Sequence, residues 1–239
     1  AEFAGLAFAL WLVRDALGAA LRPALARIGD RLALRRMFSA SRDIMLRSIL
    51  LQLSFTTFLF LGAGFGDVTL AANQVLLQFL SVTAYALDGF AFAAETLVGQ
   101  AVGARNRARL AESVRLTSTW GLAGAALMAA LFALLGPPII DLMTTAEDVR
   151  AEARHYLPWV VAAPLVGIAA WMFDGIYIGA TLTREMVLTA AFAAATYGLC
   201  VWLTWPLGNH GLWLSLMIFN AARGLSQAVF YPRIARSLP

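Results

Sequence analysis

Six long apolar segments constrain this chain more than any other feature of its sequence. They lie roughly at 44–64, 69–101, 116–136, 158–180, 186–206 and 211–231. Each is long enough to cross the roughly 30 Å of bilayer hydrocarbon as an α-helix. A helix is the expected form because a segment in lipid must satisfy its backbone hydrogen bonds internally. The sequence therefore predicts an all-α, polytopic membrane helix bundle.

The composition agrees with this class. Hydrophobic residues make up 61% of the chain and charged residues 13%, whereas soluble domains carry about 25% charged residues. The lipid bilayer is therefore the first predicted partner. The net charge of +4 is typical of basic loops beside a membrane, so no nucleic-acid partner is predicted.

The loop arginines predict how the helices are oriented. The loop between the fourth and fifth segments carries Arg184, and on the opposite side, between the third and fourth, there are only Arg150 and Arg154. The side of Arg184 also carries Arg14, Arg22, Arg27, Arg31, Arg35, Arg36, Arg42, Arg105, Arg107, Arg109, Arg115, Arg233 and Arg236. Basic loops stay in the cytoplasm. We expect a multi-pass membrane protein with its C-terminus in the cytoplasm.

The rest of the chain divides around these segments. Residues 1–13 are apolar but too short for a span, so we expect the end of a truncated transmembrane helix there. Residues 14–43 are basic and amphipathic, which predicts a cytoplasmic linker lying along anionic lipid. Residues 44–235 form the predicted six-helix lobe. An outer loop is expected at 137–157, with a short surface helix capped by Thr145.

A polar stripe in the second segment includes two carboxylates, Asp88 and Glu95. A carboxylate in hydrocarbon costs several kcal/mol and is rare unless it lines a cavity or a pathway. Alternating steps of four and three residues place the stripe on one face of a helix. Its members are Gln74, Gln78, Ser81, Tyr85, Asp88, Phe92, Glu95 and Gly99. This face is the predicted site.

Other segments add polar residues at membrane depth. Ser48, Gln52 and Thr56 follow one another at four-residue steps in the first segment. Asp174 lies deep in the fourth segment and Arg223 in the last. Arg223 can pair with Asp174 or with Glu95, and such pairs can serve helix packing alone. Three acids and one arginine leave at least two negative charges without a partner. An unpaired acid in a low dielectric can load and release a proton.

Several classes of chemistry have no support in the sequence. There is no HExxH or GxSxG motif, and a Walker A loop is excluded because the chain has no lysine. His155 and His210 are far apart in sequence, and Cys200 stands alone in an apolar run. We therefore predict no enzyme activity, no cofactor and no metal site.

Longer stretches resemble a known family. The stretch "AANQVLLQFLSVTAYALDGFAFAAETLVGQAVGARNRARL" is similar to the eighth helix and following loop of the multidrug and toxic compound extrusion (MATE) family, in which "VGQAVGAR" is a characteristic helix end. "FDGIYIGAT", "GNHGLWLSL" and "ARGLSQA" resemble its DNA-damage-inducible-protein-F (DinF) branch. The resemblance covers residues 44–235.

The resemblance implies a transporter of twelve helices in two six-helix lobes around a central cavity. This chain would supply helices 7–12, and its partner would be the missing N-terminal lobe of the same chain. The complete protein would exchange protons, with sodium as the alternative, for small organic substrates. Some branches place a Glu in helix 7, where this chain has Gln52 and no acid, which favours protons.

Three functions remain open at this point. The leading hypothesis is an efflux antiporter for cationic, amphipathic compounds, working by alternating access. Its site would be built from Asp88, Asp174, Glu95, Gln52, Thr56, Gln78 and Tyr85, with Arg223 as an ion-pair partner. A flippase for lipid-linked oligosaccharides should line its cavity with several arginines, and the sequence offers one deep arginine, Arg223. A membrane scaffold without transport would bury the stripe without access to water.

Overall fold

The computed structural model describes residues 2–14 and 30–236. It divides the chain into two compact units, 1–42 and 43–239. In the first unit, α1 spans Glu2–Leu12, inside the range predicted as the end of a truncated helix. Residues 15–29, half of the predicted linker 14–43, lie outside the described residues. The part that is described belongs to a helix beginning at Arg31.

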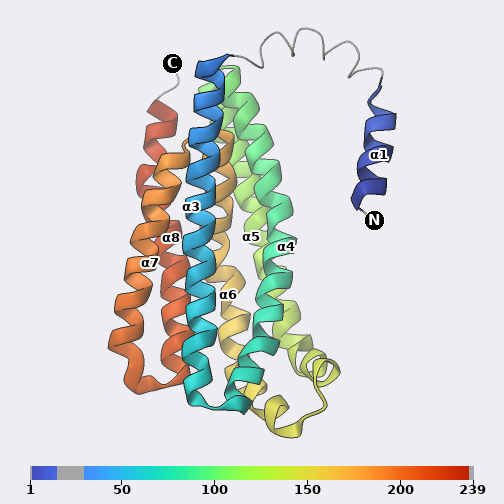
Figure 1. The fold of residues 1–239 in the computed structure, drawn as a ribbon, viewed down its shortest axis with the longest axis vertical. Coiled ribbons are helices and arrows are strands. Elements are labelled where there is room, and N and C mark those ends of the chain that lie inside the picture. Colours follow the sequence, from blue (N-terminus) through green and yellow to red (C-terminus); the bar gives the residue numbers. More distant parts are fainter. Residues whose placement is uncertain (1, 15–29, 237–239) are drawn as a thin grey trace. The chain divides into compact units, whose positions relative to one another are not determined.

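Long helices make up the described part of the second unit (Figure 1). They are α3 (Arg31–Gly62), α4 (Asp67–Gly103), α5 (Arg107–Met143), α6 (Glu147–Gly179), α7 (Thr183–Thr204) and α8 (Asn209–Arg236), with short 3-10 turns at Ala63–Phe65 and Trp205–Leu207. Helices α4, α5, α6, α7 and α8 lie side by side along their lengths. The prediction of an all-α bundle is confirmed.

Five helices among the described residues are long and apolar enough to cross a membrane. They cover Arg31–Phe65, Asp67–Gly103, Arg107–Met143, Glu147–Gly179 and Thr183–Leu207. The sixth predicted segment, 211–231, forms most of α8 but is not among them. Asn220, Arg223 and Gln227 lower its apolar character, and all three are buried in the bundle. That α8 crosses the membrane stays a prediction.

The predicted outer loop at 137–157 is wrong. Helix α5 continues through Pro137 and Pro138 to Met143, and α6 starts at Glu147 and runs through Pro158. The turn between them is held by Arg150, which donates hydrogen bonds to the carbonyls of Thr144 (2.8 Å) and Asp141 (2.9 Å). Transmembrane helices tolerate proline where neighbouring helices satisfy the freed groups.

The predicted cap of this region is also wrong. The residue before α6 is Ala146, which has no side-chain cap, and Thr145 is not the cap residue. The predicted short surface helix is the first part of α6 itself. The acids Glu147 and Asp148 do occupy its first turn, where they interact favourably with the helix dipole.

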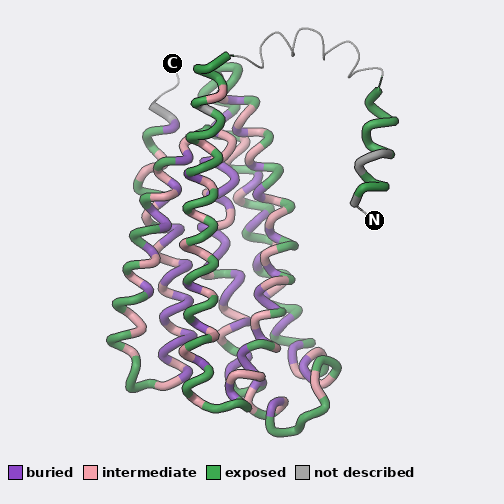
Figure 2. The backbone as a smooth tube through the Cα atoms, in the orientation of Figure 1, coloured by how far each residue is buried: buried purple, intermediate pink, exposed green. Residues whose placement is uncertain are grey.

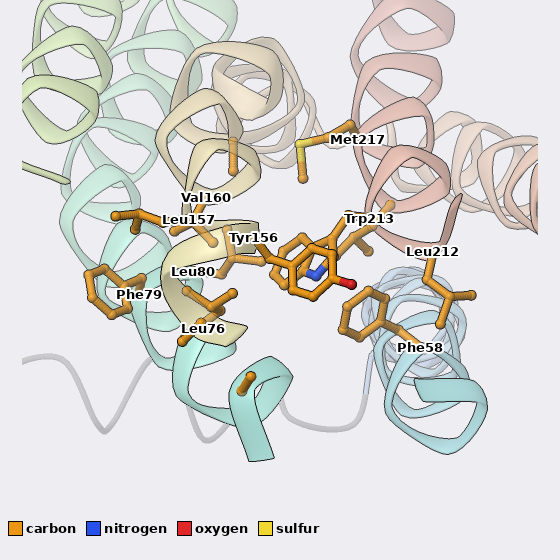
Figure 3. Packing of buried hydrophobic residues seen from close by; sticks show 14 of the residues in the cluster. Phe58, Leu76, Phe79, Leu80, Tyr156, Leu157, Val160, Leu212, Trp213 and Met217 are labelled. Atoms are coloured by element: carbon orange, nitrogen blue, oxygen red, sulfur yellow. The ribbon is translucent and has the colours of Figure 1, made fainter. Parts of the chain in front are cut away.

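The larger core cluster joins α3, α4, α5, α6, α7 and α8. Phe58 of α3 packs edge-on against Trp213 of α8 with ring centroids 4.9 Å apart, and Figure 3 shows Tyr156 beside them, with Leu76 nearer Phe79. Large apolar side chains also remain exposed, such as Phe60 (79%) and Leu134 (75%). Figure 2 shows this exposed surface along the outer faces of the helices. Such faces suit lipid contact, because lipid tails are as apolar as leucine.

Candidate functional site

A cavity of about 580 Å³ lies between α3, α4, α6 and α8. Its walls combine apolar and aromatic side chains, among them Phe55, Phe92 and Trp171. The polar side chains that line it are Arg47, Gln52, Thr56, Ser81, Asp88, Glu95, Asp174, Asn220 and Arg223. A largely apolar pocket with a few convergent polar groups is the usual form of a small-molecule site.

Asp174 lies at the centre of a charged network in this cavity. It is buried (6% exposed) in the C-terminal part of α6. Its Oδ2 accepts a hydrogen bond from Nη2 of Arg47 on α3 and lies 3.6 Å from Nη2 of Arg223 on α8. Its Oδ1 accepts a 2.8 Å hydrogen bond from Nε2 of Gln227, also on α8. One carboxylate therefore joins three helices.

Asp88 and Glu95 have a different environment. Both are half-buried on α4 and both line the cavity. Within the described part of the chain, neither forms an ion pair within 4.0 Å or accepts a side-chain hydrogen bond, in contrast to Asp174. The cavity therefore holds one compensated acid and two acids that face open space.

The other predicted site residues divide into two groups. Gln52 and Thr56 line the cavity, and Nε2 of Gln52 lies 3.5 Å from Oγ1 of Thr56. Gln78 and Tyr85 do not line it, and both are exposed, Tyr85 to 78%. They lie on the same helix face as Asp88 but farther from the space between α4 and α6.

Sequence reasoning missed Arg47 and Gln227. Arg47 lies inside an apolar segment, and only loop arginines were considered for orientation. Gln227 lies four residues after Arg223, a spacing that places both on one face of a helix, so this signal was available. The estimate of one deep arginine was therefore wrong, because the structure places Arg47 and Arg223 in the same cavity.

A second polar cluster lies where α6 and α8 begin. Nε1 of Trp159 donates to Nδ1 of His210 at 3.0 Å, and Nε2 of His210 lies 3.0 Å from Nε2 of His155. The two histidines, distant in sequence, are thus neighbours. Among the described residues there is no group of three His, Cys, Asp or Glu side chains that could hold a metal ion.

Comparison with known proteins identifies the family. The family model MatE matches residues 44–202, which is well over half of the chain. The chain belongs to the MatE family. Members of this family are transporters and not enzymes, and the predicted resemblance to MATE proteins is confirmed.

Individual MatE relatives agree with this assignment. The chain is 42% identical over 235 residues to DNA damage-inducible protein F of Escherichia coli, covering 98% of this chain and 51% of that protein. It is 26% identical over 184 residues to Protein DETOXIFICATION 42 of Arabidopsis thaliana, covering 75% of this chain and 35% of that one. The chain thus spans about half the length of the Escherichia coli protein and about a third of the Arabidopsis protein.

A solved structure shows the same fold. A mutant of the Vibrio cholerae MATE transporter VcmN superposes with a TM-score of 0.84 at 19% identity, covering 95% of this chain and 53% of that one. At this identity the likeness concerns the fold alone. The predicted MATE-type bundle is therefore confirmed as an architecture.

Proposed function

We propose that the complete protein is a secondary active antiporter that exports organic, cationic and amphipathic compounds in exchange for protons. Membership of the MatE family supports a transporter. The compounds would be bound in the cavity between α3, α4, α6 and α8, whose volume of about 580 Å³ falls in the range of pockets that hold drug-sized ligands.

The observation that carries this proposal is the pair of unpaired acids, Asp88 and Glu95. They face a cavity that also presents aromatic rings, such as Phe92 and Trp171. A carboxylate attracts a positive charge, and an aromatic face stabilises a cation at close range. An organic cation with an apolar body satisfies both features, whereas a neutral sugar would leave the acids without a partner.

Asp88 is the residue that we assign to proton exchange. It is half-buried and has no ion pair among the described residues, so a proton and a cationic substrate can compete for the same carboxylate. Loading with a proton would release the substrate on the outer side, and loss of the proton to the cytoplasm would restore the site. Alternating access would proceed by rocking of one lobe against the other.

The exposed polar residues suggest where the other lobe lies. Gln52, Thr56, Gln78 and Tyr85 are exposed on α3 and α4, in a bundle whose other exposed faces are rich in large apolar side chains. Polar groups facing lipid are costly. We propose that this face meets the N-terminal lobe across the transport pathway, in an inner membrane with the C-terminus in the cytoplasm.

A flippase for lipid-linked oligosaccharides is the alternative. The finding of Arg47 in the cavity adds to its arginines, but Arg47 and Arg223 are both directed at Asp174. The lining acids Asp88, Glu95 and Asp174 still outnumber the arginines, which disfavours an anionic headgroup. The scaffold hypothesis is disfavoured by the size of the cavity.

The test uses the complete protein in inside-out vesicles. Accumulation of ethidium, a fluorescent lipophilic cation, would be followed under an imposed proton gradient and then under a sodium gradient. We expect accumulation with the proton gradient and a loss of at least tenfold, about 1.4 kcal/mol, in Asp88→Asn. Glu112→Gln is the control, because Glu112 is exposed on α5 and outside the cavity. Proton-driven accumulation that is equal in Asp88→Asn and wild type would contradict the assignment.

A further inference from the structure

Asp174 carries one negative charge but contacts two positively charged arginines. Arg47 and Arg223 both present Nη2 to the same oxygen, Oδ2. Oδ1 is occupied by Gln227. An arginine cannot lose its proton in a protein, so these three side chains together carry a net positive charge, which is offset only by acids elsewhere in the cavity such as Asp88.

The two arginines are not equivalent. The side chain of Arg223 is 5% exposed, so it is enclosed by the bundle, whereas that of Arg47 is 14% exposed. Arg47 lies near the cytoplasmic end of the predicted first span, and Arg223 is anchored on α8 beside Gln227. Repulsion between two guanidinium groups on one oxygen weakens the hold on each of them. Arg47 is therefore the cation that can leave.

Both arginines also keep unused donors. Among the described residues, the Nε atoms of Arg47 and Arg223 are buried and have no hydrogen-bond partner, and the same holds for Oε1 of Gln227. A purely structural ion pair gains stability when its remaining donors and acceptors are satisfied. In this network two donors and one acceptor have no hydrogen-bond partner among the described residues. Such an arrangement is expected where an arginine exchanges one partner for another.

We propose that Arg47 is a built-in counter-cation, which competes with the cationic substrate for Asp174. The inference rests on the proposed function, since it requires a positively charged substrate. A substrate that enters the cavity takes the place of the Arg47 guanidinium on Oδ2 of Asp174. When the substrate leaves, Arg47 returns to Asp174, so the buried carboxylate is never left without a cation.

This exchange couples binding of the substrate to the position of α3. Arg47 on α3 forms a hydrogen-bonded ion pair with Asp174 on α6. When Arg47 is displaced, this interaction between α3 and α6 is lost. The substrate then meets a different competitor at each acid: it displaces Arg47 from Asp174, and it competes with a proton at Asp88. Arg47 acts as a positioning and specificity-determining residue.

The test measures ethidium binding to the purified complete protein in detergent, by fluorescence, at one fixed pH and without a gradient. Arg47→Gln removes the competitor, so we expect about tenfold tighter binding. Arg47→Lys keeps the charge but not the planar fork, so we expect an affinity between those of wild type and Arg47→Gln. Asp174→Asn should bind more weakly and should abolish the gain of Arg47→Gln in the double variant.

The controls separate this inference from the proposed function. Arg115→Gln changes an exposed arginine outside the cavity and should bind ethidium as wild type does. Equal or weaker binding by Arg47→Gln, with wild type binding normally, would overturn the role of Arg47 and leave the cationic substrate intact. If Arg47→Gln does not fold, Arg47→Lys gives the same test by its gain or lack of gain. A wild-type protein that binds no ethidium would overturn both proposals.

Discussion

Gly175 of α6 lies directly against the backbone carbonyl of Ala91 on α4. A Cβ atom at Gly175 would overlap the carbonyl oxygen of Ala91, and one turn later a Cβ at Gly179 would overlap that of Glu95. The small residues allow the two backbones to approach closely. Since Gly175 follows Asp174 and Ala91 lies between Asp88 and Glu95, this contact sets the distance between the acids on the two cavity walls.

Gly175→Ala should therefore destabilise the protein. Because the obstacle is backbone, the helices must separate, and overpacking of this kind costs about 1–3 kcal/mol. The measurement is the melting temperature of the purified complete protein. Gly89→Ala is the matched control, since a Cβ there meets nothing within 4 Å, and alanine favours a helix over glycine by about 1 kcal/mol. Equal melting temperatures of the two variants would contradict this account of the contact.

Gln227 should be needed to hold Asp174 in place. Its Nε2 donates to Oδ1 of Asp174, and Gln227 is 1% exposed. Gln227→Leu keeps a similar volume but leaves a buried carboxylate oxygen without its donor, which costs about 1–3 kcal/mol. We expect a lower melting temperature and weaker ethidium binding. The control Gln100→Leu changes an exposed glutamine on α4 and should leave the melting temperature and ethidium binding unchanged. If Gln227→Leu also leaves both quantities unchanged, the hydrogen bond to Asp174 contributes little.

The hydrogen bonds of the histidine cluster should contribute to stability. Trp159 donates to Nδ1 of His210, so His210 carries its proton on Nε2 and donates to Nε2 of His155. His210→Phe keeps an aromatic ring and loses both bonds, which should cost about 1–2 kcal/mol near neutral pH. The measurement is the melting temperature of purified wild type and His210→Phe at neutral pH. Equal melting temperatures of the two proteins would contradict this arrangement.

The bundle and part of the site could be predicted because both follow from local patterns. Long apolar runs predict helices wherever lipid is the solvent, and the steps of four and three placed Asp88 and Glu95 on one helix face. The same pattern included Gln78 and Tyr85, which the structure leaves outside the cavity. A period defines a face of a helix, but the neighbouring helices decide which part of that face encloses space.

Other features depended on contacts between distant residues. Arg223 had two possible partners in the sequence, and only the positions of α6 and α8 bring it to 3.6 Å from Asp174. Arg47 was overlooked because nothing local distinguishes a buried arginine from one at a helix end. The sequence predicts an outer loop at 137–157, whereas packing in the bundle lets α5 continue through Pro137 and α6 through Pro158.

The central claim is that Asp88 faces a water-filled path that a cationic substrate enters. Cysteine labelling tests it most directly, in the complete protein with Cys200 and any other native cysteine replaced by serine. Single cysteines at Ser81 and Asp88, which line the cavity, are compared with one at Leu87, which is fully buried. The account predicts rapid reaction of both cavity cysteines with a membrane-impermeant maleimide, slower reaction of Ser81→Cys when ethidium is bound, and no reaction at Leu87. Absence of labelling at both Ser81→Cys and Asp88→Cys would mean that the polar stripe of α4 serves packing alone.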